Sequence, residues 1–403
     1  MSLALAPGPA RPDENAEERR LAWRVSLKAG ALVSRSPEDE VLFPERDSAA
    51  SFWRLRLEPE ARLGARVIAA GAYEHRLRVF STPAAAAGFG VLPRDAPAPY
   101  RLRQLDWRIA DSPGSSWRHE IDRASLAADL GRLKLTLGRQ AVGWGRGVFF
   151  GAVDLFSPFS PIEADREWRR GVDAVRADVA ITDRASVDLV GAFGERFDES
   201  VVAARLRGYA GKADVEVVGG RRGRDLFAGV TSSAAVGDAE VHGELALFRA
   251  PAILPGSGGR TALKAVAGAS YRFDVADGLL VHAEYHYSGF GAKDPGGIAA
   301  LLANRDFRAR YLRGDTQILA RHAAALLASY EVSPELALAL QWLHGPADGS
   351  GLVAPSATVT LGDKLSLVGT GYLPYGPSPR GGTLTSEYGA APRSALVQVR
   401  IHE

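Results

Sequence analysis

The feature that most constrains this chain is a series of long segments in which apolar and polar residues alternate. One of them, residues 175–181, reads VRADVAI. A period of two is that of a β-strand with one apolar face. Most of the segments run for about nine to twelve residues, longer than the five or six that are usual in globular sheets. Such segments are long enough to cross a bilayer at a tilt.

The connections between these segments alternate in length. Tight turns of two to four residues, such as Thr182–Ala185 and Gly237-Asp238, are followed by long loops. Short and long connections at opposite ends are typical of outer-membrane β-barrels. The long loops are expected at residues 34–50, 81–99, 140–171, 249–261, 290–320, 345–353 and 374–393.

We therefore predict an all-β fold, a single antiparallel transmembrane β-barrel with an inward-folded loop. About nineteen candidate strands can be counted, and closure of a single-chain barrel favours an even number, so 16–18 strands are expected. Residues 1–20 are predicted to form a disordered arm and 21–403 the barrel, with one short loop helix over Gly297–Arg310. Aromatic residues near strand ends should form interfacial girdles: Trp23, Trp53, Trp107, Tyr271, Tyr285, Tyr287, Trp342 and Tyr372.

The composition of the chain limits the classes of protein and of binding site that it can represent. The hydrophobic content of 46% fits a soluble protein and a membrane barrel equally well, because the barrel also alternates apolar and polar faces. The net charge of +2 gives no global field for nucleic acid. The absence of cysteine excludes disulfides and thiolate metal sites. No run of about 18 apolar residues predicts a transmembrane helix, and no repeat of 40–50 residues supports a soluble β-propeller.

The stretch from Gly131 to Ala174 departs from the strand pattern. A strand-like start gives way to GRQAVGWGRG, in which four glycines stand among ten residues. Aromatic and proline residues follow, and then a cluster of charges from Glu163 to Arg170. The length, aromatic content and mixed charges of residues 140–171 favour a loop that folds inward and forms a constriction.

Two groups of histidine and glutamate raise the question of a metal site. His282, Glu284 and His286 share one strand face, and His242 and Glu244 repeat the pattern. Side chains at i and i+2 stand roughly 6.5–7 Å apart along a strand, which favours a polar lining of the lumen over a compact metal site. We expect no metal and no cofactor.

No enzymatic motif is convincing. The glycines of Gly143–Gly147 do not open a helix after a strand, so a phosphate loop is not indicated. There is no GxSxG motif for serine catalysis. An outer-membrane enzyme therefore remains the least favoured alternative.

One part of the chain resembles a known family. Leu137–Gln140, Trp144-Gly145, Asp154–Pro161, Arg166-Glu167 and Arg170–Ala174 look like a pattern found in bacterial outer-membrane β-barrel porins, and more loosely in the alginate-export type. The likeness covers about forty residues. It implies a channel in the bacterial outer membrane, with Arg139 and the following loop near the pore.

The predicted function is passive diffusion of small polar or anionic solutes through this channel. The expected constriction residues are Arg139, Arg146, Asp154, Glu163, Asp165, Arg166, Glu167, Arg169, Arg170 and Asp173. The expected lumen wall includes Arg54, Arg56, Arg66, His282, Glu284 and His286. A positive side formed by the arginines, opposed by the carboxylates, would create a transverse field.

Partners follow from this function. The expected partners are the bilayer with its outer-membrane lipids, and small solutes. Nucleic acid is not expected as a partner. The main alternative is a barrel that sheaths or docks a protein, such as a periplasmic electron carrier, an export component or an oligomeric partner. Such a barrel should have an unobstructed lumen.

Overall fold

A computed structural model describes residues 20–82, 91–92, 98–275 and 278–403. The predicted arm, residues 1–20, lies outside the described residues except for Arg20. Within the described residues the chain forms nineteen strands in one sheet. They are β1 (Leu21–Arg35), β2 (Asp47–Arg62), β3 (Val67–Phe80), β4 (Asp106–Ser112), β5 (Ser115–Asp129), β6 (Leu133–Gln140), β7 (Val172–Thr182), β8 (Ala185–Ala192), β9 (Val201–Ala210), β10 (Ala213–Arg222), β11 (Asp225–Val236), β12 (Ala239–Arg249), β13 (Thr261–Phe273), β14 (Leu279–Ser288), β15 (His322–Ser333), β16 (Leu336–Gly345), β17 (Ser350–Thr360), β18 (Leu365–Tyr375) and β19 (Arg393–His402).

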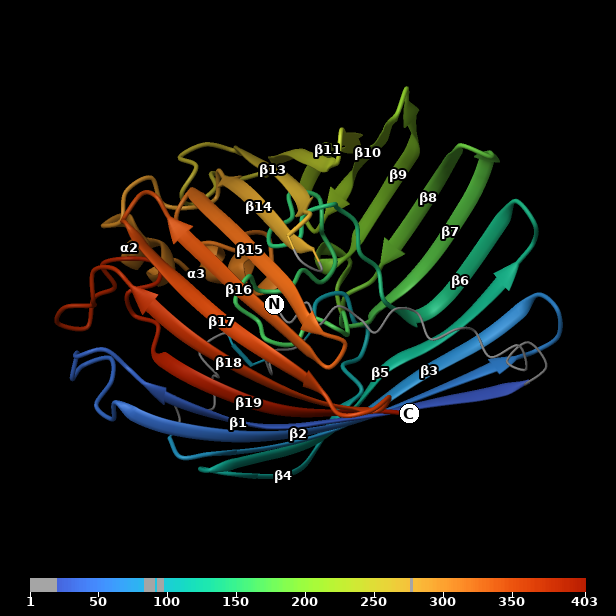
Figure 1. Ribbon diagram of the computed structural model, residues 1–403. Helices are drawn as coiled ribbons and strands as arrows, with labels where there is room; N and C mark the ends of the chain where they lie inside the picture. The colour runs from blue at the N-terminus through green and yellow to red at the C-terminus, as the bar shows by residue number, and fades with distance from the viewer. Residues whose placement is uncertain (1–19, 83–90, 93–97, 276–277) are drawn as a thin grey trace.

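The sheet closes on itself as an antiparallel barrel (Figure 1). The first strand pairs with its neighbour β2 and with the last strand, β19. β3 pairs directly with β5, and β4 pairs only with the first part of β5, from Ser115 to Glu120. Setting β4 aside, the described strands form a closed ring of 18. The prediction of 16–18 strands is confirmed at its upper value.

Residues 100–105 lie outside the sheet, and β4 begins only at Asp106. The first residues of that stretch leave the sheet because Arg101 is buried and donates hydrogen bonds to Asp122 (2.9 Å) and to the carbonyl oxygen of Gly171 (2.9 Å). A charged side chain thus ties this stretch to β5 and to the residue before β7, and only the part that follows pairs as a strand.

The two faces of the wall have opposite character. On β12, Leu245 and Leu247 are 45% and 49% exposed, whereas His242 and Glu244 on the other face are buried. On β19, Val397 is exposed and Gln398 is buried. The apolar face therefore points outward along these strands and the polar face inward. An apolar outer surface suits a hydrocarbon environment. Apolar residues outside and polar residues inside are the reverse of a soluble protein and are typical of a membrane barrel.

The aromatic residues divide between these two faces. Trp23, Trp53, Trp107 and Tyr285 are 44% to 58% exposed on the outside, as expected of interfacial girdles. Tyr372 differs, because it is only 3% exposed. It faces the interior of the barrel and does not belong to an outer girdle.

Several strands extend further than their apolar pattern predicts. Pairing of β1 with β2 continues to Arg35 and Asp47, so the connection spans only residues 36–46. Ser34, near the end of β1, points inward and lies 2.8 Å from the hydroxyl of Ser394. Because the interior accepts polar side chains, a drop in hydrophobicity does not end a strand here. β17 likewise begins at Ser350, inside the loop predicted at 345–353.

The connection between β14 and β15 holds two short helices, α2 (Gly297–Ala303) and α3 (Arg305–Arg313). The single helix predicted over Gly297–Arg310 is divided at Asn304, whose backbone is extended and whose side chain accepts hydrogen bonds from the amides of Asp306 and Phe307. No helix in the described part of the chain is long and apolar enough to span a membrane.

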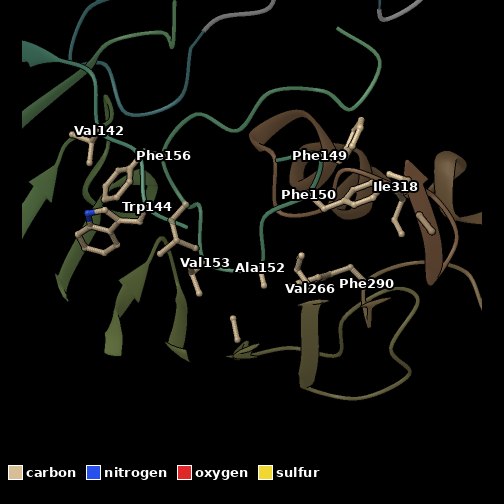
Figure 2. Close-up of a cluster of buried hydrophobic side chains, with 14 of the residues drawn as sticks. Val142, Trp144, Phe149, Phe150, Ala152, Val153, Phe156, Val266, Phe290 and Ile318 are labelled. Atoms are coloured by element: carbon tan, nitrogen blue, oxygen red, sulfur yellow. The ribbon is translucent and has the colours of Figure 1, made fainter. Parts of the chain in front are cut away.

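The largest buried apolar cluster joins the connection between β6 and β7 to the inward faces of several strands (Figure 2). We call residues 141–171 the long connection. Trp144 and Phe156 of this segment meet edge to face at 5.1 Å, and Phe150 belongs to the same buried cluster as Phe290 and Ile318 (Figure 2). The core of the protein therefore includes the long connection.

Candidate functional site

The long connection is held by side chains of the wall through an unbroken series of backbone amides. Glu244 on β12 accepts four of them. One carboxylate oxygen takes the amides of Arg146 and Gly147, the latter at 2.8 Å. The other takes Ala152 at 2.6 Å and Val153 at 3.2 Å. A single carboxylate thus fixes both ends of this turn.

Glu284 on β14 and Gln317 hold the amides in between. The Glu284 carboxylate accepts hydrogen bonds from Val148, Phe149 (2.9 Å) and Phe150 (3.1 Å). The side-chain oxygen of Gln317 accepts the amide of Gly151 at 2.8 Å. All eight amides from 146 to 153 therefore reach a side-chain acceptor. Hydrogen bonds to ionised groups are stronger than neutral ones, so a segment without regular secondary structure is held in one conformation.

Two glycines allow this close approach. Gly145 has a φ of 107°, and a Cβ there would lie 2.8 Å from a carboxylate oxygen of Glu244. A Cβ at Gly147 would lie 1.8 Å from the carbonyl oxygen of Phe150. The glycine-rich sequence that interrupts the strand pattern is thus required by the backbone path around the carboxylates.

The second half of the long connection is anchored by ion pairs. Lys28 on β1 is fully buried and lies 2.8 Å from Asp165 and 2.5 Å from Glu167. The Lys28 ammonium also stands 3.8 Å from the ring centre of Trp168, a cation–π contact. Burial would raise the pKa of Asp165, but Lys28 and Arg54 outweigh it and lower this pKa to about 2. Asp165 is therefore ionised at neutral pH.

Arg166 links the two halves of the long connection. Its guanidinium donates hydrogen bonds to the carbonyl oxygens of Val148 (2.9 Å) and Ser160 (2.8 Å). Burial lowers the pKa of Arg166 to about 10, so the group is still protonated at neutral pH. Arg169 forms an ion pair with Asp154. Both arginines therefore fix the conformation of the segment from within.

A cavity lies between the wall and the second half of the long connection. Strands β2, β3 and β5 line one side, and residues 157–170 together with the end of α3 line the other. Among the described residues, five cationic and five acidic side chains line this charged cavity. They are Arg54, Arg76, Arg78, Arg170, Arg313, Glu74, Glu120, Asp122, Glu163 and Asp165.

The charges of the cavity are interleaved along the wall. Arg54 lies 2.5 Å from Glu74, and Arg76 lies 2.5 Å from Glu120. The first pair joins β2 to β3 and the second joins β3 to β5, so opposite charges are neighbours across adjacent strands, where the sequence had suggested a positive side opposed by a negative one. The field in the cavity is local, with neighbouring charges of both signs.

Solved structures with this architecture come from bacterial outer membranes. OccAB1 of Acinetobacter baumannii superposes with a TM-score of 0.58 and 9% identity, over 95% of this chain and 96% of that chain. OccAB4 of the same organism gives 0.56 and 9%, over 96% and 98%. OccK11 of Pseudomonas aeruginosa gives 0.55 and 11%, over 95% of both chains. These proteins are outer-membrane porins.

The chain has the fold of a porin. No family model matches the sequence, and no curated protein matches it either. At 9% to 11% identity the likeness concerns the fold, so the porin fold is shared while the side chains of the site are this chain's own.

Within this porin fold, four of the predicted site residues line the charged cavity: Arg54, Glu163, Asp165 and Arg170. Others lie elsewhere. Arg139 and Asp173 form a pair with nitrogen–oxygen distances of 2.7 and 3.0 Å that joins β6 to β7. Arg146 pairs with Asp214 of β10 at 2.8 Å.

The predicted lumen-wall residues are also divided. Arg56 is buried between Glu58 and Asp122, at 3.0 Å from each. Arg66 is exposed in the turn between β2 and β3, because β3 begins only at Val67. His286 faces inward, stacks on Phe150 with ring centres 4.9 Å apart and donates a hydrogen bond to the carbonyl oxygen of Ala265.

His282 and Glu284 do lie together, and they are joined by His242 from β12. Both imidazoles approach the same oxygen of Glu284, His282 at 2.9 Å and His242 at 3.2 Å. The sequence showed which of these residues share a strand face. That His242 of β12 meets Glu284 of β14 could be seen only from the register of the sheet.

Four other residues of the site could not be identified as site residues from the sequence. Glu244 was recognised only as part of a polar pattern, and Lys28, Trp168 and Gln317 gave no signal. Their partners are far away in the chain: Glu244 is 98 residues from Arg146, and Gln317 is 166 residues from Gly151. An unusual density of inward-facing charges was the one available indication.

Proposed function

We propose that this chain is a channel of the bacterial outer membrane for passive diffusion of small polar or anionic solutes. In this proposal the long connection folds into the barrel and forms the constriction. The observation that carries it is the charged cavity, which lies between the polar inner face of a closed 18-strand ring and the anchored segment 157–170. The apolar outer face of the strands supports a position in a membrane.

Support for the inward fold comes from the anchors of the long connection. Lys28 belongs to β1, which is separated by many strands of the ring from β12 with Glu244 and β14 with Glu284, and all three side chains lie on the buried face of the wall. A segment that contacts the inner face of β1, β12 and β14 at once crosses the space that these strands enclose. Its ion pairs and hydrogen bonds favour a fixed constriction over a moving lid.

Selectivity in this proposal arises from the cavity lining. Because charges of both signs are interleaved there, a polar solute can exchange its water for side-chain hydrogen bonds along the path. Arg170 reaches the cavity from the long connection itself, and burial lowers its pKa. It is therefore a side chain through which the connection can influence the ions that pass.

The experiment is conductance of the purified protein in planar bilayers, with reversal potentials measured in a salt gradient. We expect steady conductance by the unmodified protein and a shift of the reversal potential toward cations in Arg170→Glu. Arg66→Glu, which makes the same change of charge in an exposed turn, is the matched control and should leave the potential nearly unchanged. Absence of conductance by the folded protein would refute the proposal.

The alternative of a barrel that sheaths a partner protein requires an open lumen. The apolar cluster between the long connection and the inward faces of the strands weighs against this role. A sheathing barrel would show little conductance alone, so the same recordings separate the two functions.

One group of side chains resembles the arrangement of a serine hydrolase and bears on the enzyme alternative. The hydroxyl of Ser270 lies 2.7 Å from Nδ1 of His282, whose Nε2 meets Glu284. Acyl transfer also needs donors for an oxyanion. The amides nearest to Glu284, those of Val148–Phe150, are all donated to its carboxylate. This geometry favours the channel.

A further inference from the structure

Three inward-facing side chains converge at one level of strands β12, β13 and β14. The register pairs His242 with Gly268, and Gly268 with Glu284. His242 and Glu284 thus belong to strands separated by a third, yet His242 Nε2 lies 3.2 Å from Oε1 of Glu284. His282, two residues before Glu284 on β14, brings its own Nε2 to 2.9 Å from the same oxygen.

Gly268 makes this convergence possible. A Cβ at this position would lie 2.5 Å from Cε1 and 2.6 Å from Nε2 of His242, and 2.7 Å from Cγ of Glu284. Atoms at such distances overlap, so any side chain on the middle strand would separate the imidazole from the carboxylate. The glycine leaves a space in which groups from the two outer strands meet.

More groups approach the carboxylate of Glu284 than it has lone-pair sites to accept them. A carboxylate offers about four lone-pair sites. The amides of Val148, Phe149 and Phe150 take three of them. The fourth site is approached by His242 and His282 at the same time. One ion placed between the two ring nitrogens and Oε1 would satisfy both imidazoles through a single lone pair.

We propose that His242, His282 and Glu284 form a binding site for one divalent transition-metal ion of the Zn²⁺ class. The three ligand atoms already lie within 4.8 Å of one another. Donor atoms around a tetrahedral Zn²⁺ stand roughly 3.3 Å apart, so the two observed nitrogen–oxygen distances need little change. Two neutral imidazoles and one carboxylate suit Zn²⁺, Co²⁺ or Ni²⁺ better than Mg²⁺ or Ca²⁺.

The surroundings fit such a site. A metal-bound imidazole commonly donates its other ring N–H to a neighbouring acceptor, which fixes its orientation. The hydroxyl of Ser270 lies 2.7 Å from Nδ1 of His282 and can accept this hydrogen bond. The ligating carboxylate is held in turn by backbone amides of the long connection. A bound ion would fasten β12 and β14 to the segment that we propose as the constriction, although binding itself does not depend on channel activity.

The test is calorimetric titration of the untagged full chain, purified in detergent and treated with a chelator, using Zn²⁺ and then Mg²⁺. We expect one Zn²⁺ per chain and no saturable heat with Mg²⁺. His282→Ala should abolish measurable Zn²⁺ binding. His322→Ala removes an imidazole from the neighbouring strand β15, where it is bonded to Tyr285, and should leave binding unchanged. Co²⁺ should give the visible absorption of a tetrahedral complex.

Gly268→Ala provides a second variant that keeps every ligand. Its methyl group should force His242 away from Glu284 and weaken Zn²⁺ binding by about 10–100-fold, the range found when the supporting groups of a metal site are altered. Far-UV circular dichroism must show intact strands in each variant. Absence of saturable Zn²⁺ binding by the folded unmodified protein would overturn the proposal, as would equal affinity in folded His282→Ala or Gly268→Ala.

Discussion

The carboxylate of Glu284 accepts a hydrogen bond of 2.9 Å from the backbone amide of Phe149, although the two residues are 135 positions apart in the chain. Glu244 does the same for Gly147 and Ala152. Two acidic side chains of the wall thus set the course of the long connection by binding its backbone.

The first prediction concerns the anchor Glu284. In Glu284→Gln one acceptor oxygen is replaced by a donor, so at least one buried amide of Val148–Phe150 loses its partner. Each such loss costs about 1–3 kcal/mol. Hydrogen exchange of these amides should accelerate in the variant. Glu240→Gln, an exposed position on β12, is the control, and equal protection in both variants would contradict the account.

The second prediction concerns Gly147. In Gly147→Ala the new Cβ would meet the carbonyl oxygen of Phe150, and the tight turn around Glu244 must open. We expect a loss of roughly 1–3 kcal/mol in the free energy of unfolding, the usual cost of overpacking. Gly259→Ala is matched to it, because a Cβ there meets nothing within 4 Å. Denaturant titration of the refolded proteins compares the two, and equal midpoints would argue against the strained turn.

The third prediction compares the two acidic partners of Lys28. The side chain of Asp165 is 7% exposed and that of Glu167 is 37% exposed. Asp165→Asn should therefore destabilise the protein more, by up to about 3 kcal/mol, because it leaves a buried charge with one partner fewer. Glu167→Gln should cost less than about 1 kcal/mol. The opposite order in unfolding experiments would contradict the assignment of Asp165 as the principal partner.

The fourth prediction is a pH dependence at Glu387, in the connection between β18 and β19. Burial raises the pKa of this carboxyl from 4.5 to about 7, despite hydrogen bonds from the amides of Leu319 and Ala320. A raised pKa in the folded state means that the contribution to stability is fully present below about pH 4.5 and is lost as the pH rises through 7. Glu387→Gln should remove this part of the pH dependence.

Thermal unfolding between pH 4.5 and 8 measures the effect. Glu195→Gln, at an exposed position, should retain the pH profile of the unmodified protein. A profile that is also retained in Glu387→Gln would show that Glu387 is not the group responsible.

Much of the fold could be predicted because β-structure with two different faces leaves a local signal. The alternation in residues 175–181 identifies β7 from its own residues. The tight turn at Gly237-Asp238 likewise marks the end of β11 and the start of β12. Strand ends were less accessible, since polar residues such as Ser34 point into an interior that accepts them. The break at residues 140–171 was visible as a change of composition.

The site was less predictable because its contacts join distant parts of the chain. A charge such as Arg139 reads in the sequence as a pore residue, but its partner Asp173 and three backbone carbonyls fix it between strands. Glu244 binds backbone amides, which leave no trace in side-chain patterns. The pairing of His242 with Glu284 depends on the register of two strands and on Gly268 between them.

The central claim is that the long connection, held by Glu244 and Glu284, narrows the channel. The most direct test is single-channel conductance of the double variant Glu244→Gln/Glu284→Gln beside the unmodified protein in the same bilayers. We predict a larger and noisier conductance in the variant, because the released segment no longer fills a fixed part of the lumen. An identical, steady conductance in the two proteins would contradict the claim.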